Sequence, residues 1–327
     1  MFLVESRRKI FFKYTEFILI LILSLLAGYN IIYETTDSVI YASHYNSVSW
    51  DNYLGDEVYF EYLYKLLVSF SKLILNIDYG LFASLLAFVS LQIKFYLFSK
   101  RPYSIYLKIA YLITLYPFYE SLRMRAGLAI ALVYLAIELR HRKVLSLLFV
   151  LFGAFLHNSL MPFILFWIFY NYLKDIRKVK SLIKLGLIFG IIVLVLFKYL
   201  DFIFGFLDFR VLAYIIEDQG YFNIWILPKY FLLGWMSYLI LKEKLDSLNS
   251  VLIFIGTFFV ILSFSVIKIN MLSLSLLDLG VFAYFLVVTN SDLKNKTFIR
   301  FLFIVMILME ISFKIFQLPV LLLYLLK

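Results

Sequence analysis

The sequence predicts an all-α, polytopic membrane protein built as a single integral membrane domain over residues 1–327. The first observation is composition: 64% of the residues are hydrophobic and only 16% are charged, whereas soluble domains have about 45–50% apolar and about 25% charged residues. The second is pattern, because the basic residues fall in short clusters between long apolar runs. A water-soluble fold could not bury this much apolar surface.

The apolar runs mark the candidate membrane-spanning helices. A helix that crosses a bilayer needs about 20 apolar residues, so the chain has room for about 11 spans and little else. The first run follows the basic segment SRRKIFFK without a convincing signal-peptide cleavage site, so we interpret it as a retained helix. The predicted spans are residues 17–33, 79–98, 105–119, 124–139, 144–156, 160–173, 181–199, 223–241, 248–266, 271–289 and 298–316.

Residues 57–75 have a different pattern, in which polar residues recur every three or four positions and share one face of a helix. An amphipathic helix of this kind lies in the membrane interface, here on the outer face. The alternative is an ordinary span whose polar stripe faces the helix bundle. The polar positions are Glu57, Glu61, Lys65, Ser69 and Lys72.

An interfacial helix at 57–75 gives the protein a consistent orientation. With a cytoplasmic N-terminus, most basic residues then lie on the cytoplasmic side, as the positive-inside rule requires. If residues 57–75 crossed the bilayer, every later cluster would change side. The cytoplasmic clusters are Arg7, Arg8, Lys9 and Lys13; Lys100, Arg101 and Lys108; Arg140, Arg142 and Lys143; Lys174, Arg177, Lys178, Lys180 and Lys184; Lys242 and Lys244; and Lys294, Lys296 and Arg300.

Several classes of site are absent from the sequence. There is no cysteine, which excludes disulfides, thiolate catalysis and Cys-ligated metals, and three histidines argue against a His-rich metal site. No P-loop, dinucleotide-binding G-x-G-x-x-G, G-x-S-x-G or H-E-x-x-H motif occurs. We therefore predict no metal and no cofactor, and the basic clusters reflect membrane orientation rather than nucleic-acid binding.

Two arginines, Arg123 and Arg125, stand at the outer end of the predicted helix 124–139. A charge near hydrocarbon is costly unless it has an anionic partner. Two positions along a helix differ by about 200°, so both arginines are not expected to face one cavity. One interpretation pairs them with lipid phosphates or Glu120. The sharper one has Arg125 hold a phosphate or diphosphate through bidentate hydrogen bonds.

His157 lies where one predicted span ends on the outer side and the next begins. Asn158 or Ser159 suits the N-cap of the following helix and Pro162 its first turn, so local structure alone would explain this segment. Its place on the same side as Arg125 favours a functional role.

The first outer loop is acidic and contains no Lys or Arg between Ile31 and Glu57. Asp37, Tyr41 and Tyr45 are spaced by four, so they share one face if this stretch is helical. Carboxylates in such a loop can also be simply solvated. A second outer loop, about 200–223, contains Arg210, a later turn contains Lys268, and Asp278 is an intramembrane charge with no predicted role.

Four motifs together resemble the EpsG family, Wzy-like polysaccharide polymerases of bacterial exopolysaccharide, capsule and O-antigen assembly. They are D-x-x-x-Y-x-x-x-Y (Asp37, Tyr41, Tyr45), Glu57 at the start of an aromatic amphipathic helix, RAGLAIAL from Arg125, and AFLHNSL around His157. The resemblance covers about residues 31–163, and the rest matches only in hydrophobicity and helix spacing.

One position departs from the family pattern. The family's arginine motif reads Arg-Gln followed by a small and an apolar residue, and Ala126 stands here in place of the glutamine after Arg125. The His-x-Ser element is intact in His157 and Ser159, and Lys268 stands near a frequent family arginine.

The resemblance implies glycosyl transfer at the outer face of the bacterial cytoplasmic (inner) membrane. The donor would be a growing glycan on undecaprenyl diphosphate and the acceptor a single lipid-linked repeat unit. The other implied partners are the lipid bilayer, a chain-length regulator and a flippase, without nucleic acid. The implied catalytic residues are Arg125, for the diphosphate leaving group, and Asp37, Glu57 or His157 as the base. The implied substrate-binding residues are Tyr41, Tyr45, Arg123, Ser159, Arg210 and Lys268.

Two other functions remain open. A flippase or other transporter would use midplane polar groups and often inverted repeats, for which Asp278 is a candidate, although no repeat is found. An O-antigen ligase-like enzyme or an acyltransferase is the other, although the loop at 200–223 is short for a ligase.

Overall fold

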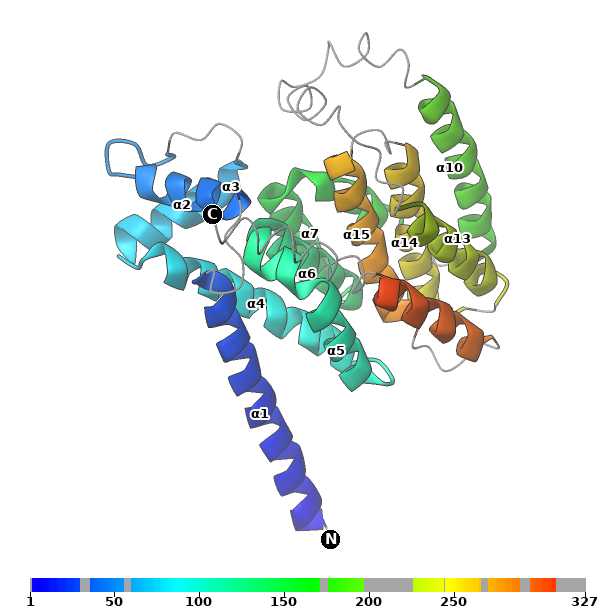
Figure 1. The fold of residues 1–327 in the computed structure, drawn as a ribbon, viewed down its shortest axis with the longest axis horizontal. Coiled ribbons are helices and arrows are strands. Elements are labelled where there is room, and N and C mark those ends of the chain that lie inside the picture. The colour runs from blue at the N-terminus through cyan, green and yellow to red at the C-terminus, as the bar shows by residue number, and fades with distance from the viewer. Residues whose placement is uncertain are drawn as a thin grey trace. The chain divides into compact units, whose positions relative to one another are not determined.

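The protein is described by a computed structural model over residues 2–29, 36–55, 60–170, 176–196, 226–243, 245–265, 270–288 and 295–309. All regular elements in these ranges are helical (Figure 1), which confirms the predicted all-α class. The contacts divide the chain into two units. Unit 1 contains Met1–Ser99 and Tyr111–Trp167, and unit 2 contains Lys100–Ala110 and Ile168–Lys327. A single membrane domain over 1–327 stays a prediction.

Two helices in the described ranges are long and apolar enough to cross a membrane, namely Tyr79–Ser99 and Ser247–Ser265. Each predicted span overlaps a helix, but the predicted number of about 11 crossings is not confirmed. The shorter apolar helices are Ser104–Thr114, Lys143–Leu156, Asn158–Ile168, Leu227–Leu241 and Leu276–Val287.

Unit 1 is built around α4 (Tyr79–Ser99), which packs against α1 (Phe2–Gly28) and α6 (Met124–Glu138). Helix α6 pairs in turn with α7 (Lys143–Leu156), as Figure 1 shows. Close packing of α1 on α4 depends on Gly28, where a Cβ atom would collide with backbone atoms of α4. This arrangement places the start of α6 beside the end of α7.

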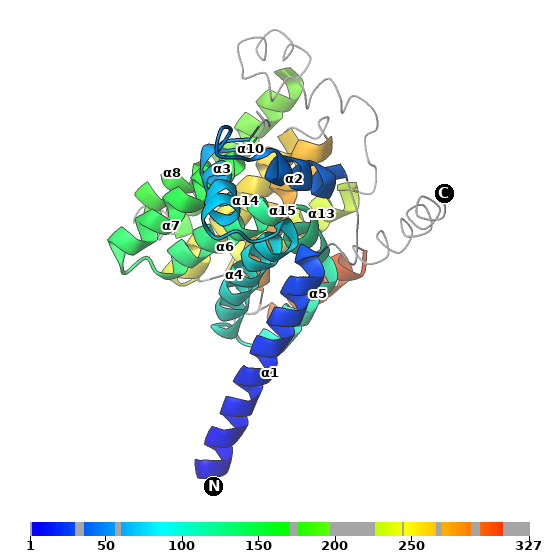
Figure 2. The ribbon, with the colours of Figure 1, turned by 90° about the vertical axis from the view of Figure 1, so that its left-hand side faces the viewer.

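Two short helices lie at the end of unit 1 where α6 begins and α7 ends. They are α2 (Thr36–Ser47) and α3 (Tyr62–Ser69), which lie close together in both ribbon views (Figures 1 and 2). Tyr41 of α2 packs edge-on against Tyr64 of α3, with 5.7 Å between the ring centroids. Helix α3 also packs against α7.

The predicted amphipathic helix at 57–75 begins later than expected. Helix α3 starts at Tyr62 and continues as a π-helical segment over Phe70–Ile74. Glu61 is its N-cap residue, with an extended backbone (φ −65°, ψ 145°). Because the Glu61 carboxylate bonds to groups of α6 and of the turn that follows α7, this residue is held outside the helix.

A buried charged cluster holds the segment that leads into α6. Lys94 of α4 forms an ion pair with Glu120 at 2.5 Å, and both side chains are fully buried. The same carboxylate oxygen, Glu120 Oε1, accepts hydrogen bonds from Tyr111 (2.5 Å) and Ser90 (3.1 Å). The cluster ties the π-helical segment Pro117–Leu122 to α4.

Gly127 allows this segment to approach α6 closely. A Cβ atom there would collide with the backbone oxygen of Tyr119 and lie 3.3 Å from Glu120 Oε2. We therefore expect Gly127→Ala to lower the free energy of unfolding by about 1–3 kcal/mol, since backbone must move to make room. Thermal unfolding of the detergent-solubilised protein measures this. The matched control is Gly234→Ala in α13, where an added Cβ meets no atom within 4 Å; equal losses in both variants would contradict the prediction.

Unit 2 contains α10 (Ile176–Leu196), α13 (Ile226–Leu241), α14 (Ser247–Ser265) and α15 (Asn270–Val287), followed by a helix over 296–309. Helix α14 packs against each of the other three named helices, and most closely on α15. There a Cβ atom on Gly280 would lie 2.8 Å from the carbonyl oxygen of Gly256.

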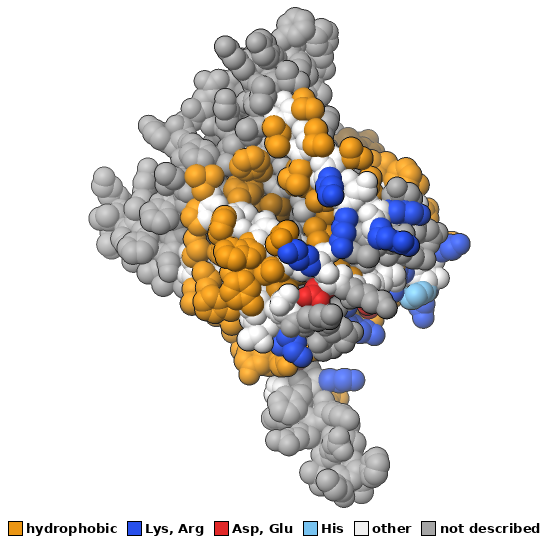
Figure 3. Space-filling view, turned by 90° about the vertical axis from the view of Figure 1, so that its right-hand side faces the viewer, with side chains coloured by type: hydrophobic (Ala, Val, Ile, Leu, Met, Phe, Trp, Pro, Cys, Tyr) orange, Lys and Arg blue, Asp and Glu red, His pale blue; other side chains and the backbone are white. Residues whose placement is uncertain are grey.

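The surface of the molecule carries many large exposed apolar side chains. Figure 3 shows them over a wide part of one face, with Lys and Arg side chains gathered to one side. Exposed apolar patches of this extent are unusual for soluble monomers and suit contact with lipid. In unit 2 they include Leu185, Ile188, Ile191, Phe231, Trp235 and Tyr238.

Candidate functional site

Arg125 lies in the first turn of α6. Three aromatic rings lie around it: one from α2, one from α3 and one from Phe60, which precedes α3. Its guanidinium carbon is 4.6 Å from the ring centroid of Phe60, 5.3 Å from that of Tyr41 and 5.4 Å from that of Tyr64. Its Nε atom donates a hydrogen bond to the Tyr41 hydroxyl at 2.9 Å. The rings are buried, so they stabilise the cation by cation–π contact and restrict its position.

Glu61 connects Arg125 to the segment around His157. Its Oε2 atom forms an ion pair with Arg125 Nη1. Its Oε1 atom accepts a hydrogen bond from the backbone N–H of Asn158 at 3.2 Å and lies 3.6 Å from Nδ1 of His157. The Arg125 side chain is 13% exposed and that of Glu61 9% exposed. This single carboxylate therefore bridges three elements of unit 1.

His157 ends α7 with an extended backbone (φ −152°, ψ 107°), which turns the chain toward Glu61. Burial, together with the nearby cations Arg125 and Arg123, lowers the pKa of His157 to about 3. In the described ranges its Nδ1 atom has no hydrogen-bond partner. The imidazole is therefore neutral at physiological pH and is a weak base in this environment.

The structure brings together three of the residues that the sequence predicts. Arg125, His157 and Tyr41 lie within one cluster, where Tyr41 accepts a hydrogen bond from Arg125 and is only 6% exposed. Tyr41 therefore holds Arg125 in place and has little surface to offer a sugar. Ser159 follows His157 in a 3₁₀ turn, with a buried hydroxyl that has no partner among the described residues.

Tyr45 does not join this cluster, although it shares the α2 face with Tyr41. Its hydroxyl donates a hydrogen bond to the carbonyl oxygen of Ile77 at 2.5 Å. Burial raises the pKa of Tyr45 to about 12, and the nearby Asp78 contributes to this rise. Tyr45 is thus buried away from Arg125, and its substrate contact stays a prediction.

Four predicted residues lie outside what the structure describes. The side chain of Asp37 is one of them, although its backbone belongs to α2 as the four-residue spacing predicts. The others are Glu57, Arg210 and Lys268.

The predicted separation of Arg123 and Arg125 around one helix is wrong, because Arg123 lies outside the helix. Helix α6 begins at Met124, and Arg123 is its N-cap residue with a non-helical backbone (φ −123°, ψ 52°). The expected separation of about 200° requires both residues to be helical. Both cations instead lie close enough to His157 to lower its pKa.

Sequence reasoning missed the importance of Glu61. The sequence pattern identifies Glu61 only as one polar position of the amphipathic helix, and the predicted candidates for the base are Asp37, Glu57 and His157. A usable signal was its position between Phe60 and Tyr64, because a carboxylate among aromatic residues suits a buried cation. The contact with Arg125 spans 64 residues, so no local pattern could identify it.

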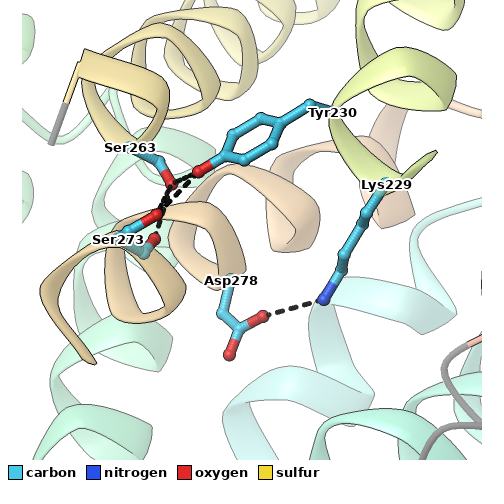
Figure 4. Close-up of polar contacts among 5 residues, drawn as sticks. All are labelled: Lys229, Tyr230, Ser263, Ser273 and Asp278. Carbon is cyan, nitrogen blue, oxygen red and sulfur yellow. Dashed lines mark hydrogen bonds and ion pairs between the residues drawn. The ribbon is translucent and has the colours of Figure 1, made fainter. Parts of the chain in front are cut away.

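Unit 2 contains a second polar cluster, shown in Figure 4. Lys229 of α13 forms an ion pair with Asp278 of α15 at 3.4 Å, and both side chains are largely buried. The neighbouring Tyr230 hydroxyl is hydrogen-bonded to Ser263 and Ser273. Asp278, which the sequence offers only as a candidate polar group of a transporter, therefore joins α15 to α13 through a charge pair.

Comparison with known proteins extends the resemblance to nearly the whole chain. The model of the EpsG family matches residues 13–324, well beyond the residues 31–163 that carry the motifs. No curated protein and no solved structure matches the chain significantly. The protein therefore belongs to the EpsG family, which is associated with membranes and polysaccharide polymerisation.

Proposed function

We propose that this protein is a polysaccharide polymerase at the outer face of the bacterial cytoplasmic membrane, which joins undecaprenyl-diphosphate-linked repeat units. The observation that carries the proposal is the cluster of Arg125, Glu61 and His157, in which a partly buried cation lies next to a neutral imidazole. Family membership supports the reaction class. A chain-length regulator and a flippase would be its partners in the membrane.

The reaction requires one bond to form and one to break. A hydroxyl oxygen of the acceptor unit bonds to the anomeric carbon of the donor glycan, and the bond from that carbon to the lipid diphosphate breaks, leaving its electron pair on the diphosphate. Arg125 stabilises this developing negative charge by a preorganised, charge-assisted contact. His157 accepts the proton of the acceptor hydroxyl.

A deletion strain complemented with site variants tests this function. We expect the deletion to leave single repeat units on the cell surface, and we expect His157→Ala to slow polymer formation by about 10²-fold or more because the acceptor hydroxyl loses its base. The matched control is His141→Ala, which removes an exposed histidine from the α6–α7 connection. Polysaccharide length on gels is the readout, together with the amount of protein in the membrane. Long polymer made by His157→Ala at normal protein levels would contradict the assignment of the base.

A transporter of lipid-linked oligosaccharide is the second candidate, favoured by the Lys229–Asp278 pair. Charged pairs among apolar helices often mark transport pathways. The two functions differ in the deletion strain: loss of a flippase strands lipid-linked units on the cytoplasmic face, whereas loss of a polymerase leaves single units exported and attached. An O-antigen ligase would differ again, since its loss leaves no units attached.

A further inference from the structure

Glu61 occupies the position on Arg125 that an anionic substrate would need. The guanidinium has its Nε atom bonded to Tyr41 and its Nη1 atom paired with Glu61, and aromatic rings surround it. A diphosphate must therefore compete with this carboxylate before Arg125 can act on it. Two phosphoryl groups carry more charge than one carboxylate, and they suit bidentate recognition by arginine.

We propose that Glu61 exchanges partners during the reaction: the donor diphosphate displaces its carboxylate from Arg125, and the carboxylate then pairs with His157. This inference rests on the proposed function and adds Glu61 to it as a positioning residue. It assigns to Glu61 two successive roles, first as the counter-ion of Arg125 and then as the partner of the base.

The distances make this exchange a small movement. Glu61 Oε1 already lies 3.6 Å from His157 Nδ1, so an approach of about 0.7 Å gives an ordinary N–H···O hydrogen bond. The Asn158 N–H, which donates to the same oxygen at 3.2 Å, keeps the carboxylate at this end of α7. Release of Oε2 from Arg125 therefore leaves Glu61 beside its second partner.

The charges around His157 give the exchange a chemical consequence. Among the described residues, the charged groups that face the imidazole are Glu61, Arg123 and Arg125. In the empty site the Glu61 carboxylate is paired with Arg125, and burial together with the two arginines holds the pKa of His157 at about 3. A bound diphosphate neutralises the arginines and frees the carboxylate. Both changes raise the pKa of His157 toward its ordinary value.

The donor would thus create the base that its own reaction needs. With Nδ1–H donated to Glu61, the other ring nitrogen, Nε2, is free to accept the proton of the acceptor hydroxyl. The acceptor oxygen bonds to the anomeric carbon, the bond to the diphosphate breaks, and the proton ends on His157 as imidazolium paired with Glu61. In the empty site the imidazole is too weak a base for this step.

Titration of His157 by NMR tests the exchange directly. The full-length protein, labelled with ¹⁵N at its histidine side chains and held in detergent micelles, is titrated with acid in the absence and presence of inorganic diphosphate. The exposed His141 provides an internal reference, and His157→Gln assigns the signal. We expect His157 to remain neutral down to about pH 4 without diphosphate and to titrate at least one pH unit higher with it.

Glu61→Gln provides a second, independent readout. Without the competing carboxylate, Arg125 is expected to bind diphosphate on the order of tenfold more tightly. Transfer at saturating donor should nevertheless slow by about 10²-fold, because His157 loses its partner. A purely structural role of Glu61 would weaken binding and transfer together. If the variant does not fold, the titration of His157 in the wild-type protein tests the exchange by itself.

The outcomes separate this inference from the proposed function. If wild-type protein binds diphosphate, in a manner that Arg125→Ala abolishes, but the His157 titration does not move, the exchange is wrong and the proposed function stands. If diphosphate does not bind at all, the assignment of Arg125 to the leaving group fails, and the exchange fails with it. Looser diphosphate binding by Glu61→Gln would also overturn the exchange.

Discussion

Replacing Arg125 with alanine is expected to slow polymer formation by about 10²- to 10³-fold. In a group transfer that releases a lipid diphosphate, the largest electrostatic demand falls on the departing oxygen. Arg125 is held for this task by the Tyr41 hydroxyl and three aromatic rings, so the cation stays in place when the charge develops on a diphosphate that has displaced Glu61. Removing the guanidinium also leaves the Glu61 carboxylate without its cation, which adds a loss of stability.

Two further variants make the Arg125 experiment decisive. Arg125→Lys keeps the charge but loses the planar, bidentate geometry, so we expect it to restore only part of the activity. Arg142→Ala removes an exposed arginine at the start of α7 and should leave polymer length unchanged. Transfer rates of purified protein with lipid-linked repeat units are the measurement. A rate for Arg125→Ala within a few-fold of Arg142→Ala would show that the leaving group does not depend on Arg125.

Replacing Lys94 with methionine is expected to destabilise the protein by about 3–5 kcal/mol. Lys94 and Glu120 are fully buried, and Glu120 Oε2 has no hydrogen-bond partner among the described residues. The substitution therefore leaves a carboxylate in an apolar interior with only the hydroxyl groups of Tyr111 and Ser90 on Oε1. Because Glu120 lies just before Arg123 and Arg125, activity should fall together with stability.

A double-mutant cycle separates the charge effect from simple packing. A variant with both Lys94→Met and Glu120→Met has no buried charge, and it should regain most of the stability that the single variants lose. Chemical or thermal unfolding in one detergent, followed for the wild type, both single variants and the double variant, gives the coupling energy. If the losses simply add, the ion pair does not stabilise the link between α4 and the segment before α6.

The sequence predicts the helices well because hydropathy acts locally. An apolar run of this length has few alternatives to a helix in a membrane, since its backbone groups must be hydrogen-bonded within the segment. Helices α4, α6 and α7 therefore begin and end within a few residues of their predicted limits. The helix at 57–75 is less well placed, because its start is decided by the contacts of Glu61 rather than by periodicity.

The site is predicted only in part. Arg125 and His157 stand out because an arginine and a histidine at the ends of apolar helices are unusual and because their motifs resemble those of a family. Lys94 gave no such signal, since one lysine near the end of an apolar run is expected to reach the membrane surface. The structure instead places its ammonium group against Glu120, which the sequence offered as a partner for the arginines.

By itself, the sequence determined the all-α class, the apolar helices, and the membership of Arg125 and His157 in one family pattern. Only the tertiary structure decided which carboxylate belongs to which cation: Glu61 to Arg125 and Glu120 to Lys94. The physical reason is the distance along the chain over which each effect acts. Hydropathy and helix formation depend on neighbours in the chain, whereas a buried charge takes the partner that packing brings to it, here 64 and 26 residues away.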